Sequence, residues 1–209
     1  MPRYRKSPAL TEWQTSRRAN VNELQRAHTL IGNVGPGSGP GRPPKAGTVQ
    51  LNEALVLRVV TEFQGFVRDL FDLATIKMVR ASGCDHRYQA QLISAATRDR
   101  LIDRGNPHLE AIKRDADRLG IAQLGFRLGA ENTRHATDAA VLKDLVELRN
   151  ALAHDDEGKL LVPSRSGVRP TIGYAGAAQV VLGRHARALD RVVWDHLVNL
   201  FPTTDPWSP

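Results

Sequence analysis

Cysteine, aromatic residues and long apolar runs are all scarce in this chain of 209 residues. The single cysteine, Cys84, excludes an internal disulfide framework and a cysteine-rich zinc site. No apolar run approaches the roughly 18 to 20 residues that span a bilayer. The basic residues at the start are followed by no apolar stretch, so no secretory signal is expected. These absences predict a cytoplasmic protein that makes no contact with a membrane.

The composition is that of a folded protein. Apolar residues make up 41% of the chain, which is enough for a packed core and excludes a disordered chain. Aromatic residues contribute only 5%. The length allows one domain, or one domain with an appendage.

The charge is strongly positive and unevenly distributed. The net charge is +7, which favours an anionic partner. Residues 1–50 carry eight Lys and Arg against two Glu, whereas residues 51–209 carry 21 basic and 20 acidic residues. The excess is therefore a property of the N-terminal segment. Arginine outnumbers lysine 23 to 6, which suits bidentate contacts with phosphate, although a GC-rich genome is the more ordinary explanation.

Four segments follow one another along the chain. Residues 1–31 contain a basic amphipathic helix, whose start is expected at Thr11 because Thr11 and Gln14 resemble a capping box. Trp13 lies on its apolar stripe as a packing anchor. Residues 32–48 are a flexible Gly/Pro-rich linker, residues 49–201 form a helical domain, and residues 202–209 are a loose tail.

The helical domain shows 3.6-residue periodicity throughout. Its helices are expected over residues 52–82, 86–104, 108–119, 121–129, 137–156 and 175–200, with a loop or small hairpin over 159–174. Asn52 is the expected cap of the first of these helices, and Gly83 its stop. The expected architecture is an all-α bundle of about five to seven helices, with the N-terminal amphipathic helix attached through the linker.

The glycines of the linker do not form a nucleotide site. No strand precedes them, prolines interrupt them, and no Gly-Lys-Ser/Thr ending follows them. We therefore expect no cofactor.

Three Arg–His pairs have four or five residues between their members. They are Arg80 with His86, Arg149 with His154, and Arg191 with His196. The first crosses an expected helix end, and the third has Val192 directly after its arginine. Only the middle pair has a polar residue, Asn150, after the arginine and lies near the end of an apolar helix. Five histidines are expected to be surface or structural residues, because none has the spacing of a metal ligand: His28, His86, His108, His135 and His185.

Arg149, Asn150 and His154 make residues 50–200 resemble the HEPN superfamily, whose motif is Arg, a following polar residue and a downstream His. The subgroup it is most similar to is the stand-alone bacterial HEPN ribonucleases of the RiboL-PSP-associated kind. The resemblance implies an endoribonuclease that forms a homodimer, with two motifs in one groove. It also implies a toxin of a toxin–antitoxin or phage-defence system, with an antitoxin protein as partner.

These three residues suit metal-independent cleavage of RNA. The 2′-hydroxyl of RNA is its own nucleophile, so the site needs a base, an acid and positive charge on the transition state. His154 titrates in the required range, and Arg149 can bind the phosphate oxygens. Asn150 can orient His154 or the phosphate, and the product is a 2′,3′-cyclic phosphate. No metal is required, and no metal site is expected.

Two alternatives remain open for the arginine and for the function. Arg149 lies on the flank of an apolar helix face, so a structural salt bridge to Glu62 or Asp69 is the alternative to a phosphate site. The alternative function is a non-catalytic HEPN-like module that binds a nucleotide or a protein, such as an antitoxin. A basic helical DNA-binding regulator is less favoured, because the charge lies outside any recognition helix. Deletion of residues 1–48 is expected to weaken RNA affinity more than it impairs cleavage.

Overall fold

The computed structural model describes residues 3–33, 46–154, 168–202 and 205–207. These residues form helices and no strand, as the all-α prediction requires. No helix within these ranges is both long enough and apolar enough to cross a membrane.

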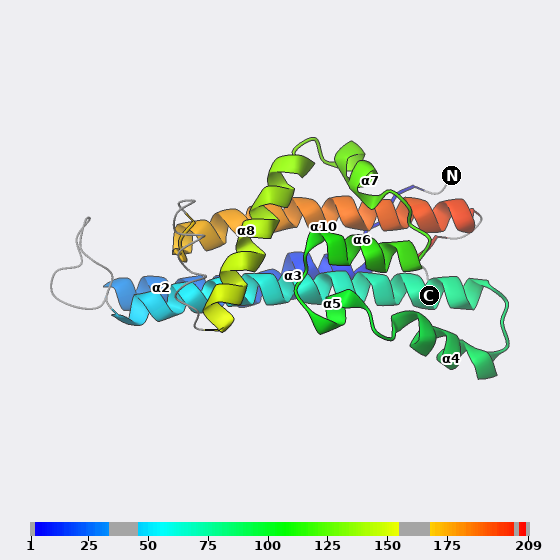
Figure 1. Cartoon of the computed structure of the whole chain (residues 1–209), viewed down its shortest axis with the longest axis horizontal. Helices are drawn as coiled ribbons and strands as arrows, with labels where there is room; N and C mark the ends of the chain where they lie inside the picture. Colours follow the sequence, from blue (N-terminus) through cyan, green and yellow to red (C-terminus); the bar gives the residue numbers. More distant parts are fainter. Residues whose placement is uncertain (1–2, 34–45, 155–167, 203–204, 208–209) are drawn as a thin grey trace.

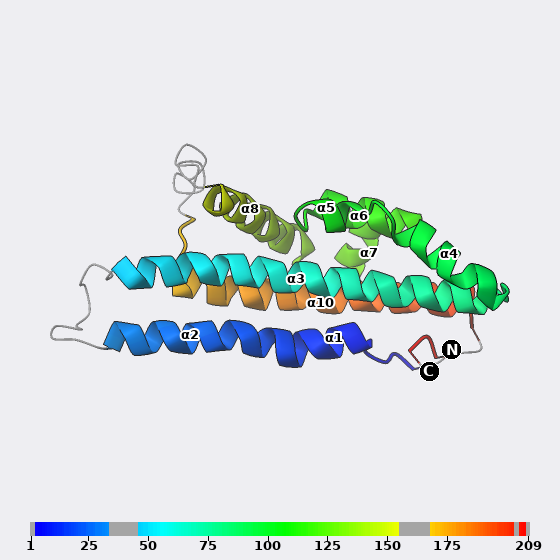
Figure 2. The same cartoon turned by 90° about the horizontal axis from the view of Figure 1, so that it is seen from below.

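Two long helices form the centre of the molecule. α3 (Ala46–Ala81) and α10 (Ile172–Leu200) run side by side, as Figures 1 and 2 show. On one side of this pair lie α1 (Pro8–Glu12) and α2 (Arg18–Asn33), joined by a π-helical turn at Trp13–Arg17. The opposite side is covered by the remaining helices, which are α4 (His86–Thr97), α5 (Leu101–Arg104), α6 (Leu109–Arg118), α7 (Leu124–Glu131) and α8 (His135–Ala153).

α3 is buried around most of its circumference because other helices cover both of its sides. Phe63, Phe66 and Phe71 are each at most 1% exposed. The helix begins at Ala46, six residues before the expected cap. Asn52 is therefore a buried residue inside the helix and not its cap. Since α2 ends at Asn33, the linker is shorter than expected, and residues 34–45 lie outside the described ranges.

The N-terminal segment is part of the core. Its helix begins earlier than Thr11, because the Ser7 side chain accepts a hydrogen bond from the Leu10 N–H at 2.9 Å and caps α1. Leu10 is completely buried, and Trp13 packs edge-on against Phe63 with ring centroids 5.8 Å apart. The prediction that Trp13 is a packing anchor is confirmed.

The helix expected over residues 86–104 is interrupted. α4 ends at Thr97, and Asp99 adopts a positive φ of 60°. This left-handed residue turns the chain before the short helix α5. No glycine or proline marks the break, which is why periodicity alone predicts one continuous helix.

The later boundaries differ from expectation by a few residues. Gly120, with φ of 75°, separates α6 from the next helix as predicted. α8 begins at His135, and His154 is its C-cap residue, so the expected extension to residue 156 falls outside the described ranges. α10 begins three residues early, at Ile172, where the Thr171 side chain caps it. Of the expected hairpin, residues 159–167 also lie outside the described ranges.

The tail is packed where the structure describes it. Trp207 lies against Trp194 of α10, with ring centroids 6.4 Å apart, and Pro206 is buried. Arg5 donates to Asp205 at 3.1 Å, which brings the two ends of the chain together. Residues 205–207 are therefore not loose, because aromatic packing against α10 holds them.

Candidate functional site

The predicted site residues lie at the C-terminal end of α8. Arg149 and Asn150 are half-buried in its last turn, and His154 is exposed at its C-cap. The buried face of α8 includes Leu145 and Leu148, so Arg149 lies at the flank of the apolar face as predicted. The His154 backbone N–H donates to the carbonyl of Asn150 at 3.2 Å, which ends the helix at that point. The imidazole is thus presented to solvent one turn after Asn150.

Asn150 connects two donors from different parts of the chain. Its Oδ1 accepts from Nη1 of Arg149 at 3.4 Å and also from Nδ2 of Asn106. Asn106 lies in the connection between α5 and α6, 44 positions away in sequence. The Oδ1 of Asn106 is buried and has no hydrogen-bond partner. The end of α8 therefore has a fixed polar centre that also contains an unused acceptor.

The connection that contains Asn106 is held in place by α3 and α6. Gln64 of α3 donates from Nε2 to the carbonyls of Ile102 at 2.6 Å and Gly105 at 2.8 Å. Asp115 of α6 is buried and accepts from the backbone N–H groups of Leu101 at 3.0 Å and Ile102 at 2.8 Å. Because this carboxylate satisfies two amides at the start of α5, it fixes the short helix that precedes Asn106.

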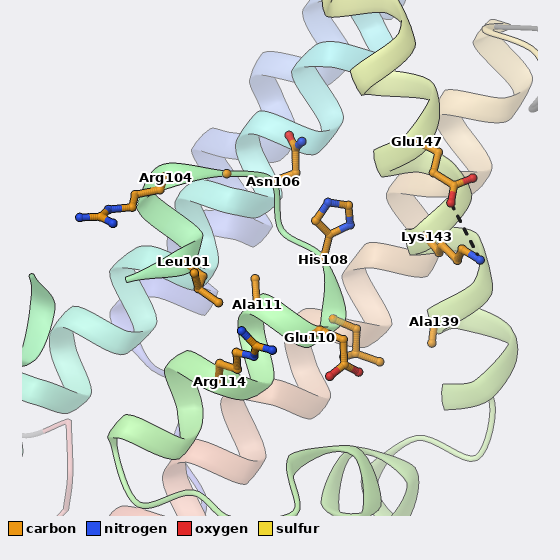
Figure 3. Close-up of a pocket in the computed structure, with 12 residues that line it drawn as sticks. Leu101, Arg104, Asn106, His108, Glu110, Ala111, Arg114, Ala139, Lys143 and Glu147 are labelled. Carbon is orange, nitrogen blue, oxygen red and sulfur yellow. Dashed lines mark ion pairs between the residues drawn. The ribbon is translucent and has the colours of Figure 1, made fainter. Parts of the chain in front are cut away.

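A groove of about 850 Å³ opens beside this polar centre, between α8 and the α5–α6 region. Figure 3 shows its lining side chains, with His108 between the α5–α6 region and the Lys143–Glu147 pair of α8. The residues that line it are Leu101, Arg104, Gly105, Asn106, His108, Leu109, Glu110, Ala111, Arg114, Ala139, Lys143 and Glu147. Asn106 belongs to both the groove and the polar centre, so the two features are continuous. Arg149 and His154 do not line the groove.

The groove carries charges of both signs. Lys143 and Glu147 form an ion pair at 3.9 Å along α8, and Glu110 pairs with Lys113 at 2.7 Å. Hydrogen bonding to Lys113 lowers the pKa of Glu110, so this carboxylate is ionised at neutral pH. Arg114 forms no ion pair with any described residue, and it adds positive charge to the α6 wall.

The predicted structural alternative for Arg149 is not what the structure contains. Glu62 and Asp69 bind a different arginine, Arg17, at 3.0 Å and 2.5 Å. The hydrogen bond that Arg149 makes within the described residues goes to Asn150. A salt bridge from Arg149 to Glu62 or Asp69 is therefore the wrong explanation, because Arg17 pairs with both carboxylates.

The other two Arg–His pairs have structural roles or lie apart. His196 bonds through Nε2 to the carbonyl of Leu119 at 2.8 Å, and Arg191 pairs with Asp195 at 3.1 Å. Arg80 and His86 lie on either side of the turn between α3 and α4, as the sequence predicts. What distinguishes the middle pair is the hydrogen bond from Arg149 to the polar residue that follows it, Asn150.

Two further histidines, the half-buried His135 and the buried His185, form a pair between α8 and α10. His135 and His185 meet edge to face, with ring centroids 5.5 Å apart. Nδ1 of His135 and Nε2 of His185 are buried without hydrogen-bond partners. Burial lowers the pKa of both imidazoles, so both are neutral at pH 7. The described residues contain no group of three or more His, Cys, Asp or Glu side chains suited to hold a metal ion.

The sequence pattern missed Asn106, Gln64 and Asp115. Asn106 stands in a Gly-Asn-Pro segment that reads only as a helix stop, and Gln64 looks like a polar position on a long helix. Asp115 is one of several carboxylates on α6. Their roles depend on contacts over 13 or more positions, which no local pattern reveals.

No family model, curated protein or solved structure matches this chain. The function must therefore be argued from the site itself.

Proposed function

We propose that this chain is a metal-independent endoribonuclease of the HEPN kind, with Arg149, Asn150 and His154 at its active site. The observation that carries the proposal is the position of Asn150. Its side chain joins Arg149 to Asn106, a residue that lines the groove, and it lies one helical turn before an exposed histidine. The Oδ1 of Asn106 in this centre is buried without a hydrogen-bond partner, which costs stability and favours a functional role.

Each group has a defined part in the chemistry. An imidazole of His154 removes the proton of the 2′-hydroxyl, whose oxygen then bonds to phosphorus. The bond from phosphorus to the 5′-oxygen breaks, and a second imidazole protonates the leaving oxygen. Arg149 neutralises the charge that develops on the phosphate oxygens. The products are a 2′,3′-cyclic phosphate and a free 5′-hydroxyl.

One chain supplies one of the two imidazoles. A homodimer with two copies of the motif facing each other would supply the second, as the resemblance to HEPN proteins implies. The exposed position of His154 at the helix end leaves it free to meet such a partner. A toxin role and a neutralising antitoxin are part of the same proposal.

The test uses the chain's own matched controls. Wild-type protein is incubated with end-labelled RNA in excess chelator, beside His154→Ala and Arg149→Ala. His86→Ala and Arg80→Ala are the controls, since His86 and Arg80 are exposed and have nearly the same spacing. The expected loss for each motif variant is at least about 100-fold in rate, with no change in the controls. Cleavage that survives both motif substitutions would exclude this site.

The groove favours the second candidate, a nucleotide- or protein-binding module without catalysis. Its walls combine apolar side chains with charges of both signs, a mixture typical of ligand sites. Absence of cleavage by the wild type across varied RNAs, together with nucleotide binding that Arg114→Ala weakens, would favour this module over the nuclease.

A further inference from the structure

A second, smaller groove lies on the other side of the α3–α10 pair. It has a volume of about 230 Å³ and is lined by Trp13, Gln14, Arg18, Gln179, Val180, Gly183 and Arg187. Its walls come from the N-terminal segment and from α10. In Figure 2 the N-terminal helices lie on the side of α10 opposite α8, so this groove is separate from the one beside Asn150.

The lining of this groove supplies hydrogen-bond donors and contains no carboxylate. Arg18 and Arg187 are exposed, and neither forms an ion pair with a described residue. Nε2 of Gln179 is buried and has no hydrogen-bond partner. The carbonyl oxygen of Gln14 accepts from Lys6 at 2.8 Å, which leaves its NH₂ group as a donor. Two fixed positive charges and several unused donors match an anion.

Gly183 lies next to two donors of this groove, the Arg187 guanidinium and the indole N–H of Trp13. A Cβ placed on Gly183 would lie 3.8 Å from Nη1 of Arg187 and 3.9 Å from Nε1 of Trp13. Both distances are ordinary van der Waals contacts, so packing alone does not require glycine here. Glycine in the middle of a helix costs about 1 kcal/mol relative to alanine. The missing side chain keeps the space between the guanidinium and the indole N–H open.

Arg18 follows directly after the π-helical turn at Trp13–Arg17. Such turns are rare and occur frequently at functional sites. The two adjacent arginines have different surroundings: Arg17 is half-buried against Glu62 and Asp69 of α3, whereas Arg18 lines the groove against α10. The first arginine is used for stability, and the second is left available for a ligand.

Arg187 also lines a neighbouring groove of about 430 Å³, whose other charged residues are Lys6, Arg184, Arg191 and one carboxylate, Glu131. Arg184 and Arg191 are paired with Asp138 and Asp195, so they contribute less positive charge. Lys6 has a neutral partner, Gln14. Because Arg187 belongs to both grooves, Arg18, Arg187 and Lys6 follow one another along the boundary between the N-terminal segment and α10.

We propose that this boundary binds consecutive phosphates of a single nucleic-acid strand, with Arg18 and Arg187 on one phosphate and Lys6 on the next. Two planar guanidiniums flanking one pocket suit the bidentate geometry of a phosphate group. A row of cations matches the repeated phosphates of a strand better than it matches an isolated anion. The proposal does not depend on the nuclease function, since it concerns other residues on another face.

The test measures binding of a fluorescein-labelled 20-mer of thymidylate by fluorescence anisotropy at several salt concentrations. This probe lacks a 2′-hydroxyl, so binding is measured without cleavage. Single-strand binding constants fall with roughly the 0.7 power of salt concentration per phosphate contact. Each lost phosphate contact is therefore expected to lower the binding constant about fivefold at 0.1 M salt, when 1 M salt is taken as the reference. The double variant Arg18→Ala/Arg187→Ala is expected to bind roughly 5- to 25-fold more weakly, with a shallower salt dependence.

The matched control is Arg80→Ala/Arg98→Ala, which removes two exposed arginines, one near the end of α3 and one in the turn after α4. This variant has the same net charge as the test variant, and its affinity for the oligonucleotide is expected to fall by less than about twofold. Thermal unfolding of both variants checks that they fold. Equal losses in the two would show that only net charge matters and would overturn the proposal.

A third variant, Gly183→Ala, separates binding from stability. It is expected to raise the melting temperature, because alanine favours the helix. It is also expected to weaken binding of the oligonucleotide, because its methyl group fills the space between the donors. Unchanged affinity in this variant and in the double variant would overturn the proposal. Binding of vesicles containing phosphatidylserine, or of inorganic phosphate, without binding of the oligonucleotide would overturn it as well.

Discussion

Arg17 donates from Nη1 to Oε2 of Glu62 across 3.0 Å, joining the N-terminal segment to the middle of α3. The same guanidinium reaches Asp69 through Nη2, at 2.5 Å. The Glu62 side chain is only 6% exposed, and Asn20 also donates to it at 2.8 Å. Part of the positive charge in residues 1–50 is therefore neutralised by carboxylates of α3. This part cannot act as a free cationic arm.

Arg17→Ala is expected to lower the free energy of unfolding by about 2–4 kcal/mol, because it leaves the carboxylate of Glu62 buried with fewer partners. Chemical denaturation measures the loss. Arg18→Ala is the control, since Arg18 is exposed and has no ion pair within the described residues. Similar losses for the two variants would contradict the assignment of Arg17 to the core.

Gly65→Ala is expected to destabilise the protein although alanine is the better helix former. A Cβ at this position would lie 2.9 Å from Cζ of Arg17, so the guanidinium would have to leave its carboxylates. A loss of roughly 1–3 kcal/mol is expected, which is typical of overpacking. In the Arg17→Ala background the same substitution should become neutral or stabilising. A loss of the same size in both backgrounds would exclude this mechanism.

Deletion of residues 1–33 is expected to leave the remaining chain unfolded or expanded. It removes Leu10, Trp13 and Val21 from the hydrophobic core and exposes the faces of Phe63 and Phe66 that they cover. This expectation replaces the one drawn from charge alone, that deleting residues 1–48 would weaken RNA affinity more than it impairs cleavage. Circular dichroism with dye binding to exposed apolar surface measures the outcome. A cooperative unfolding transition in the deleted protein would show that the segment is separable.

Acid is expected to destabilise the protein through the pair of His135 and His185. Burial lowers the pKa of His185, which faces His135, Asp138 and Arg184, with Lys113 near His135. The unfolded chain takes up protons near the ordinary histidine pKa of about 6.5, whereas the folded protein does so only at lower pH. The stability is therefore complete above this range and falls as the pH drops below it.

The measurement is the free energy of unfolding at pH 7.5 and pH 5.5 for wild type and His185→Leu. His185→Leu should lose less free energy of unfolding between the two pH values, because it removes one histidine whose pKa is lowered in the folded protein. His86→Ala, which changes an exposed histidine, should follow the wild type. An unchanged pH dependence in His185→Leu would assign the acid sensitivity to other groups.

Asp115→Ala is expected to lower the free energy of unfolding by about 1–3 kcal/mol, because the amides of Leu101 and Ile102 lose their acceptor. Asp117→Ala, two residues later and exposed, is the control. If the proposed nuclease is correct, Asp115→Ala should also slow cleavage, since α5 positions Asn106. A variant as stable as the control would show that Asp115 is not needed as a cap.

The sequence alone was sufficient for the coarse architecture. The 3.6-residue spacing of apolar positions identifies α3, α8 and α10, because each must bury one or more faces against neighbours. The same spacing places Trp13 in the core and Arg149 at the flank of an apolar face. Helix ends were less accurate where no glycine or proline marks them, as at Asp99, whose left-handed conformation depends on the packing of α5.

Tertiary structure decided which charged and polar residues meet. Arg17 and Arg18 are neighbours in sequence but have different surroundings, because adjacent residues of a helix point about 100° apart and here face different helices, α3 and α10. Asn106 and Asn150 come together across 44 positions because Gln64 and Asp115 hold the intervening connection. Periodicity reports only whether a position is buried, and it carries no information about the partner on the next helix. The identity of that partner determines which arginines stabilise the fold and which remain available to bind a ligand.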